Sequence, residues 1–168
     1  LMNIPNLSNA EPTIVDSKTW NQSGSTFRIE ILIENQGEFF TNNWKSQLTA
    51  RKCKVTNSGC DKVWEINDFS TLPHEFMHYH ENSLVLSDLN GDEEIDSFFM
   101  YRIASDGLDS ETFKSMVHIN DTKYAIRGKL SKHIDNIGQF SYQFDNSYSN
   151  LDMRTVVVTK KLLDDNIN

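Results

Sequence analysis

The stretch TFRIEILIEN, residues 26–35, decides the fold class because its apolar and polar side chains alternate. Phe27, Ile29, Ile31 and Ile33 fall on one face of an extended chain, and mostly charged side chains fall on the other. A period of two residues is typical of a strand that is buried on one face only. We therefore predict a β-strand here, with the four apolar side chains in a core.

Runs with strand character recur along the rest of the chain. They lie at 44–55, 62–69, 83–87, 95–104, 113–120 and 123–128. Residues 72–81 suit a short helix with Pro73 in its first turn. Residues 151–163 suit either a helix or a strand, and residues 129–150 follow no clear pattern.

This order of elements predicts a mostly β (α+β) fold, an antiparallel sheet or sandwich-like single domain with one or two short helices. The length of 168 residues fits one domain, 1–168. Residues 1–25 are expected to form a polar N-terminal lead-in with one short strand around Thr13–Asp16.

The net charge of −8 argues against nucleic acid as a partner, because phosphate binding needs concentrated Lys and Arg. It favours cations, basic proteins or neutral glycans as partners. No run of the sequence approaches the roughly 20 apolar residues that a membrane helix requires, so no membrane span is expected.

Cys53 and Cys60 are the two cysteines of the chain, in CKVTNSGC. Asn57-Ser58-Gly59 between them is turn chemistry, and the flanking runs have strand character. The pair could therefore close a hairpin with a disulfide, and the alternative is two reduced cysteines in a cytosolic protein. We predict the disulfide, and with it an oxidising compartment.

An acidic loop, SDLNGDEEID, joins the strands expected at 83–87 and 95–104. Its oxygen-bearing residues stand at the first, third, fifth, seventh and ninth positions of the loop: Asp88, Asn90, Asp92, Glu94 (through its carbonyl) and Asp96. Calcium needs six to eight oxygen ligands, and alternating side chains on a tight loop converge on one point. We predict a calcium site here, and the alternative is a solvated acidic turn.

The loop resembles the calcium loops of FG-GAP or VCBS-type repeats, in which an apolar strand runs into D-x-[DN]-x-D-G-x-x-D. It departs from them at Glu93, where those loops have a glycine, commonly with a positive φ. Residues 83–130 as a whole are similar to small exported bacterial proteins. Some members are associated with surface polysaccharides, and proteins of this size include periplasmic immunity proteins of type VI secretion effectors.

His74-Glu75-Phe76-Met77-His78 spells H-E-x-x-H, the zincin signature. On a helix, His74 and His78 would bind zinc and Glu75 would activate a water. Pro73 directly before the motif and the strand expected by Ser83 leave room for about two helical turns, and no third ligand stands at a zincin-like spacing. A zinc-dependent hydrolase is therefore the weaker alternative.

Together these observations predict a non-enzymatic binding protein in the periplasm or otherwise outside the cytoplasm, with its signal peptide already removed. Its most concrete form is an immunity protein that binds and inhibits a secreted bacterial toxin, with calcium holding one loop. The alternatives are a glycan-binding module of the envelope or surface polysaccharide, and the zinc hydrolase.

Overall fold

The structure is a computed structural model that describes residues 11–106, 110–131 and 140–167. Its elements, in chain order, are β1 (Thr13–Gln22), β2 (Ser25–Gln36), β3 (Lys45–Thr56), β4 (Gly59–Ser70), β5 (Glu75–Tyr79), β6 (Val85–Ser87), β7 (Asp96–Ser105), β8 (Glu111–Ile119), β9 (Thr122–Leu130), β10 (Phe140–Phe144), the 3-10 helix η1 (Asn146–Asn150) and α1 (Met153–Ile167).

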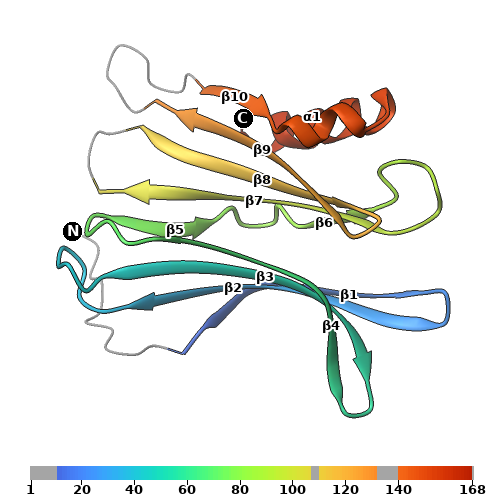
Figure 1. Cartoon of the computed structure of the whole chain (residues 1–168), viewed down its shortest axis with the longest axis horizontal. Helices are drawn as coiled ribbons and strands as arrows, with labels where there is room; N and C mark the ends of the chain where they lie inside the picture. Colours follow the sequence, from blue (N-terminus) through green and yellow to red (C-terminus); the bar gives the residue numbers. More distant parts are fainter. Residues whose placement is uncertain (1–10, 107–109, 132–139, 168) are drawn as a thin grey trace.

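The strands form two antiparallel sheets that lie one above the other (Figure 1). The first sheet is a meander in the order β1-β2-β3-β4. The second sheet runs β10-β9-β8-β7-β5, and the short β6 also pairs with β7. Helix α1 covers the face of the second sheet that points away from the first. The mostly β, sandwich-like fold is thus confirmed.

Strand β7 lies at the centre of this arrangement because four consecutive large side chains on it are buried. Phe99 and Tyr101 face the first sheet, where they pack with Ile29 and Ile31 of β2. Phe98 and Met100 point the other way, into a second core that α1 closes with Leu163, among others. A strand buried on both faces reads as a continuous apolar run, as FFMY does here.

The prediction of a helix at 72–81 is wrong, because Glu75–Tyr79 forms strand β5 and pairs with β7. Met77 and Tyr79 alternate into the core between the sheets, which is the pattern of a strand. The lead-in is more structured than expected. Thr13–Gln22 forms a ten-residue edge strand, mostly exposed on its surface, which is why its sequence is polar.

The C-terminal segment 151–163, for which the sequence allowed a helix or a strand, belongs to helix α1 from Met153 onward. Asp152 caps α1, since its carboxylate accepts hydrogen bonds from the backbone N–H and the hydroxyl of Thr155. Neither helix in the described ranges is long and apolar enough to cross a membrane.

Polar contacts also join the two sheets. The Tyr101 hydroxyl donates to Asp68 of β4 across 2.9 Å, and Lys52 of β3 forms a 2.7 Å ion pair with Asp121 in the β8–β9 turn. Beside this ion pair, the rings of Trp64 (β4) and His118 (β8) stack with centroids 3.8 Å apart. His118 is only 3% exposed, so its ring is part of the core between the sheets.

We predict that acid destabilises the fold through His118. Burial lowers the pKa of His118 to about 3, and Lys123 and Lys52 act in the same direction. The unfolded chain takes up a proton near pH 6.5, so stability is complete above that pH and is lost below it by about 1.4 kcal/mol per pH unit. Urea unfolding should give a free energy about 2 kcal/mol lower at pH 5 than at pH 7.

His118→Phe keeps a ring on Trp64 and removes the titrating group, so it should abolish most of this difference. His74→Phe, at a partly exposed position outside the core, serves as the control and should leave the difference intact. An unchanged pH dependence in His118→Phe would contradict the assignment.

Candidate functional site

The acidic loop lies between β6 and β7, at the end of the molecule drawn on the right in Figure 1. Two neighbours hold it in place. The Ile95 N–H donates to the Gln22 side chain of β1, and Asn120 of the β8–β9 turn bonds to Asp92 and Asp96. The loop is therefore anchored to both sheets.

The backbone of the loop folds around the side chain of Asp88. The Asp88 carboxylate accepts N–H groups from Gly91, Asp92 and Glu93, which closes the chain around it. Glu93 has φ of +69°, a left-handed conformation that glycine adopts more readily than a residue with a side chain. Glu93 thus has the positive φ expected at this position, at a conformational cost that glycine would avoid.

The side-chain oxygens of the loop are occupied by hydrogen bonds. Asn90 donates its amide to Asp92 across 2.7 Å, and this contact, with the Glu94 N–H, lowers the pKa of Asp92. Asp96 is buried and accepts the N–H groups of Leu89 and Asn120, and burial raises the pKa of its carboxyl.

The fit of this loop to calcium is therefore partial. The loop closes around Asp88, but no group of three or more Asp, Glu, His or Cys side chains in the described ranges is placed to hold a metal. The Arg154 guanidinium of α1 also lies against Gly91, where an added Cβ would collide with it. A cation beside the loop opposes a second one, so calcium at Asp88, Asn90, Asp92, Glu94 and Asp96 stays a prediction.

The H-E-x-x-H motif lacks the helical geometry that zincin chemistry needs. His78 lies on strand β5, whereas His74 lies in the turn before the strand, so the two histidines do not share the face of a helix. Glu75 accepts a hydrogen bond from Ser70 across 2.6 Å, which gives it a structural role at the start of β5. Residues 75–78 of the motif are part of the sheet.

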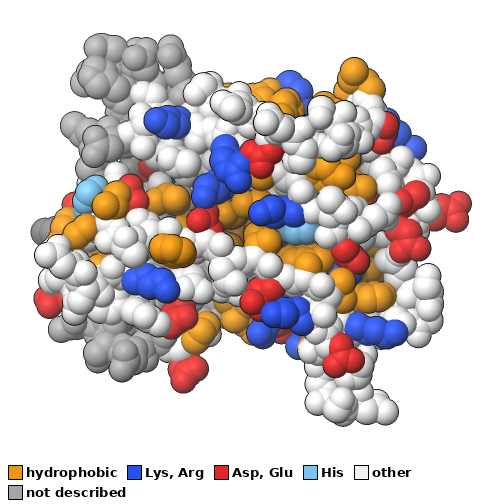
Figure 2. All heavy atoms as spheres, in the orientation of Figure 1, with side chains coloured by type: hydrophobic (Ala, Val, Ile, Leu, Met, Phe, Trp, Pro, Cys, Tyr) orange, Lys and Arg blue, Asp and Glu red, His pale blue; other side chains and the backbone are white. Residues whose placement is uncertain are grey.

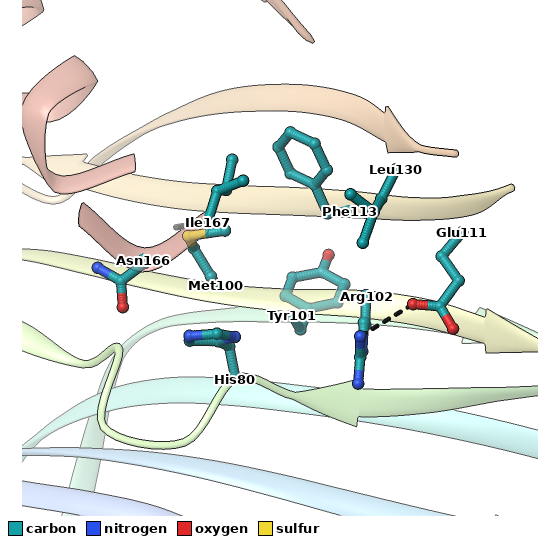
Figure 3. Close-up of a pocket in the computed structure, with 9 residues that line it drawn as sticks. All are labelled: His80, Met100, Tyr101, Arg102, Glu111, Phe113, Leu130, Asn166 and Ile167. Atoms are coloured by element: carbon teal, nitrogen blue, oxygen red, sulfur yellow. Dashed lines mark hydrogen bonds and ion pairs between the residues drawn. The ribbon is translucent and has the colours of Figure 1, made fainter. Parts of the chain in front are cut away.

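A small pocket that the sequence did not indicate lies beside the C-terminal end of α1 (Figure 3). Its volume is about 110 Å³, well below that of sites for drug-sized ligands. Apolar side chains such as Phe113 and Ile167 form most of its wall. Arg102 and Glu111 form a 3.0 Å ion pair at its edge, and burial lowers the pKa of His80. The pocket suits a side-chain-sized apolar group.

A more exposed apolar surface lies at the opposite end of the first sheet from the acidic loop. We define the aromatic patch as Phe40, Phe69 and Leu72, whose side chains are 61%, 57% and 49% exposed. The Phe40 N–H donates to the Pro73 carbonyl across 2.8 Å, which ties the β2–β3 loop to the β4–β5 connection. Figure 2 shows hydrophobic side chains reaching the surface at this end, on the left.

We predict that calcium, if it binds the loop, stabilises the fold with millimolar affinity. With a dissociation constant of about 1 mM, 10 mM calcium should stabilise the folded state by about 1.4 kcal/mol. The calcium-dependent rise in melting temperature should vanish in Asp88→Ala and Asp92→Ala. It should persist in Glu94→Gln, because only the backbone carbonyl of Glu94 would bind. No rise and no titration heat at 10 mM calcium would mean that the loop is an acidic turn.

Comparisons with protein-family models, with curated proteins and with solved structures found no match to this chain. Its function is therefore argued from its own surface.

Proposed function

We propose that the protein is a non-catalytic binding protein of an extracytoplasmic compartment, and most concretely an immunity protein that binds a secreted bacterial toxin in the periplasm and inhibits it. The aromatic patch is the observation that carries the proposal, and the disulfide and the net charge support it.

The stability of the fold does not favour a phenylalanine at position 40. Its φ of +69° is a left-handed conformation that costs an ordinary residue about 1–2 kcal/mol and that Gly or Asn adopts more readily. Its side chain is 61% exposed, so little burial offsets that cost. An exposed aromatic ring on a strained backbone fits a contact residue for a partner.

Within the patch, Phe40 is supported by packing against other rings. The ring of Phe39 lies 4.4 Å from Phe40, 5.0 Å from Trp44 and 6.1 Å from Phe76, measured between centroids. Trp44 is buried and donates its indole N–H to the Glu75 carbonyl across 2.6 Å. Aromatic side chains fixed in advance lose little entropy on binding, which is the property of protein-interface anchors.

The compartment and the charge agree with this function. Cys53 and Cys60 form a disulfide, which hints at an oxidising, extracytoplasmic setting. A net charge of −8 would speed the encounter with a basic toxin and orient it. The toxin's active site would then be covered by the rigid end of the sandwich.

The tryptophans favour a protein partner over a glycan. Glycan sites commonly use an exposed aromatic face as a platform, but Trp44 is buried and Trp64 is covered by His118. Trp20 stacks on Phe27, with centroids 5.7 Å apart, and the Lys52 ammonium lies over the same rings. All three serve the fold.

The decisive experiment uses the gene next to the one that encodes this chain. Its product, if toxic when exported to the periplasm, should be neutralised by co-expression of this protein and should form a stable complex with it after purification. Absence of both neutralisation and complex, together with binding to purified surface polysaccharide, would instead support the glycan-binding alternative.

We predict that substitution of Phe40 affects the affinity for the toxin and the stability of the fold differently. Phe40→Asp should weaken the toxin complex at least 30-fold, as expected for an anchor worth about 2 kcal/mol or more. Phe40→Asn should weaken it as well, yet leave the free energy of unfolding unchanged or raise it by up to about 1 kcal/mol, because Asn tolerates the left-handed backbone.

The matched control is Met153→Asp, which changes an exposed apolar side chain at the start of α1, on the other side of the molecule. Calorimetric titration and urea unfolding measure the two quantities. Equal affinity for wild type and Phe40→Asp would remove the patch from the interface.

A further inference from the structure

The β3–β4 hairpin leaves the body of the sandwich at one place. Lys52 and Trp64 are the last cross-strand pair before a shift in register, after which Cys53 faces Lys62. Val63 is the extra residue on β4, and a bulge of this kind bends a ribbon and increases its twist. Figure 1 shows the hairpin turning away from both sheets beyond this point, at the lower right.

The projecting part, residues 54–63, contributes almost nothing to either core. Every residue in it is exposed except Thr56, which is half-buried. Val55 and Val63 are among the exposed large apolar side chains of the described chain. A two-stranded ribbon without a hydrophobic face is marginally stable by itself, so its order needs another source.

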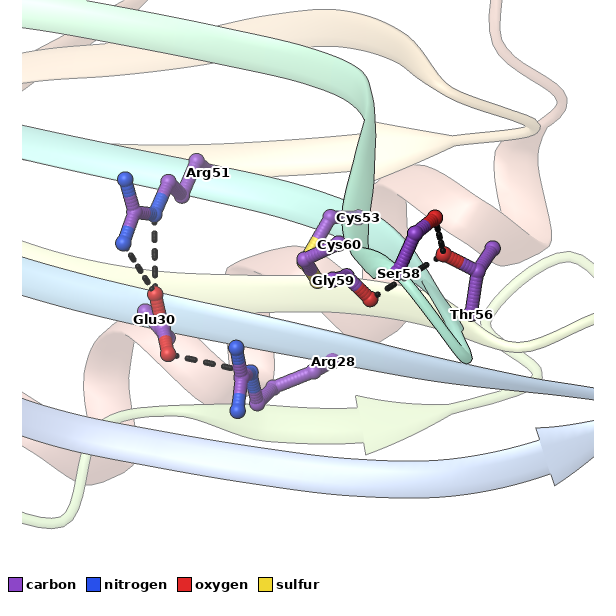
Figure 4. Close-up of a disulfide and its surroundings, with 8 residues drawn as sticks. All are labelled: Arg28, Glu30, Arg51, Cys53, Thr56, Ser58, Gly59 and Cys60. Carbon is purple, nitrogen blue, oxygen red and sulfur yellow. Dashed lines mark hydrogen bonds and ion pairs between the residues drawn. A yellow bond between two sulfur atoms is a disulfide. The ribbon is translucent and has the colours of Figure 1, made fainter.

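The disulfide supplies that order (Figure 4). Cys53 is buried at the base of the projection, Cys60 is exposed, and their Cα atoms lie 5.4 Å apart. Gly59 permits the turn with φ of +142°, a region that side-chain-bearing residues rarely adopt. Thr56 adds hydrogen bonds to the Ser58 hydroxyl and the Gly59 carbonyl. The tip is therefore held in one shape before any partner arrives.

The charges around the hairpin differ in sign from those of the whole chain. Lys62 lies 63% exposed at its base, 3.7 Å from Glu65. On the adjacent outer face of the first sheet, Arg28 and Arg51 share the single buried carboxylate of Glu30, at 3.0 Å and 2.6 Å (Figure 4). Glu65 lies opposite Arg51 in the β3–β4 register, so Arg28 and Arg51 are balanced by Glu30 and Glu65. The projection itself carries Lys54 and Lys62 against Asp61, which gives it a net charge of +1 in a protein of net charge −8.

We infer that residues 54–63 are a preformed plug that enters an acidic, concave site on the partner protein. A narrow, rigid ribbon with two exposed valines fits a cleft better than a flat surface. The net positive charge of the ribbon complements acidic walls, and the disulfide reduces the entropy lost on insertion. The inference rests on the proposed function in that the partner is a protein. It adds a contact distant from the aromatic patch.

The experiment uses the full chain and the purified toxin encoded by the neighbouring gene. A photo-crosslinking residue at Asn57, in the tip, should join the two proteins, and the same residue at Met153 of α1 should not. Lys62→Glu should slow association about 3- to 10-fold at low salt, and this effect should shrink as salt screens the charges. Lys161→Glu, the same change on exposed α1, is the matched control and should leave the rate unchanged.

Removal of the disulfide tests separately whether the shape of the tip is preformed. Cys53→Ala/Cys60→Ala should keep the circular dichroism spectrum of the folded chain and weaken the complex about tenfold, because the tip must then be ordered on binding. Mass spectrometry of the wild-type protein with and without reductant confirms that the bond is present in the sample.

The possible outcomes separate the two proposals. A complex that depends on Phe40, with no cross-link from Asn57 and equal rates for Lys62→Glu and Lys161→Glu, overturns the plug and leaves the immunity function standing. A toxin that neither binds nor is neutralised overturns the proposed function, and the plug with it. A cross-link from Asn57 together with a slowed Lys62→Glu supports both.

Discussion

Strand β7 is the constraint on which the two layers of the protein depend. Its side chains alternate between two cores, so Phe99 and Tyr101 fix the first sheet while Phe98 and Met100 fix α1. Each of these four side chains is at most 4% exposed. Since burial of large apolar side chains dominates folding energy, both layers are positioned by the register of one strand. The more exposed elements are arranged around this centre.

Polar contacts then hold the two sheets together at the end of the sandwich that carries the acidic loop. The Lys52–Asp121 ion pair joins the first sheet to the β8–β9 turn, and Asn120 in that turn bonds to the acidic loop. His118 packs on Trp64 within the same region. Because these groups share neighbours, a change at one of them is expected to affect the others non-additively. The loop is thus coupled to the core, whatever it binds.

Two surface features remain that folding does not explain. The aromatic patch exposes Phe40 on a strained backbone, and the hairpin tip at 54–63 stays ordered without a core. Both incur a folding cost and both are rigid, the first through ring packing and the second through the Cys53–Cys60 disulfide. Rigid exposed groups bind with a small entropy loss, so a binding function accounts for the two features together.

The sequence by itself determined the elements whose local pattern agrees with their environment. The alternation of Ile29 and Ile31 and the turn between Cys53 and Cys60 were predictable, because each depends on neighbours in the chain. Only the tertiary structure decided the rest. Residues 75–79 became a strand because pairing with β7 buries Met77 and Tyr79, which overrides a weak local preference for helix. The exposure of Phe40, the burial of His118 and the outward bend at Val63 likewise depend on contacts between segments far apart in the sequence, which no local pattern records.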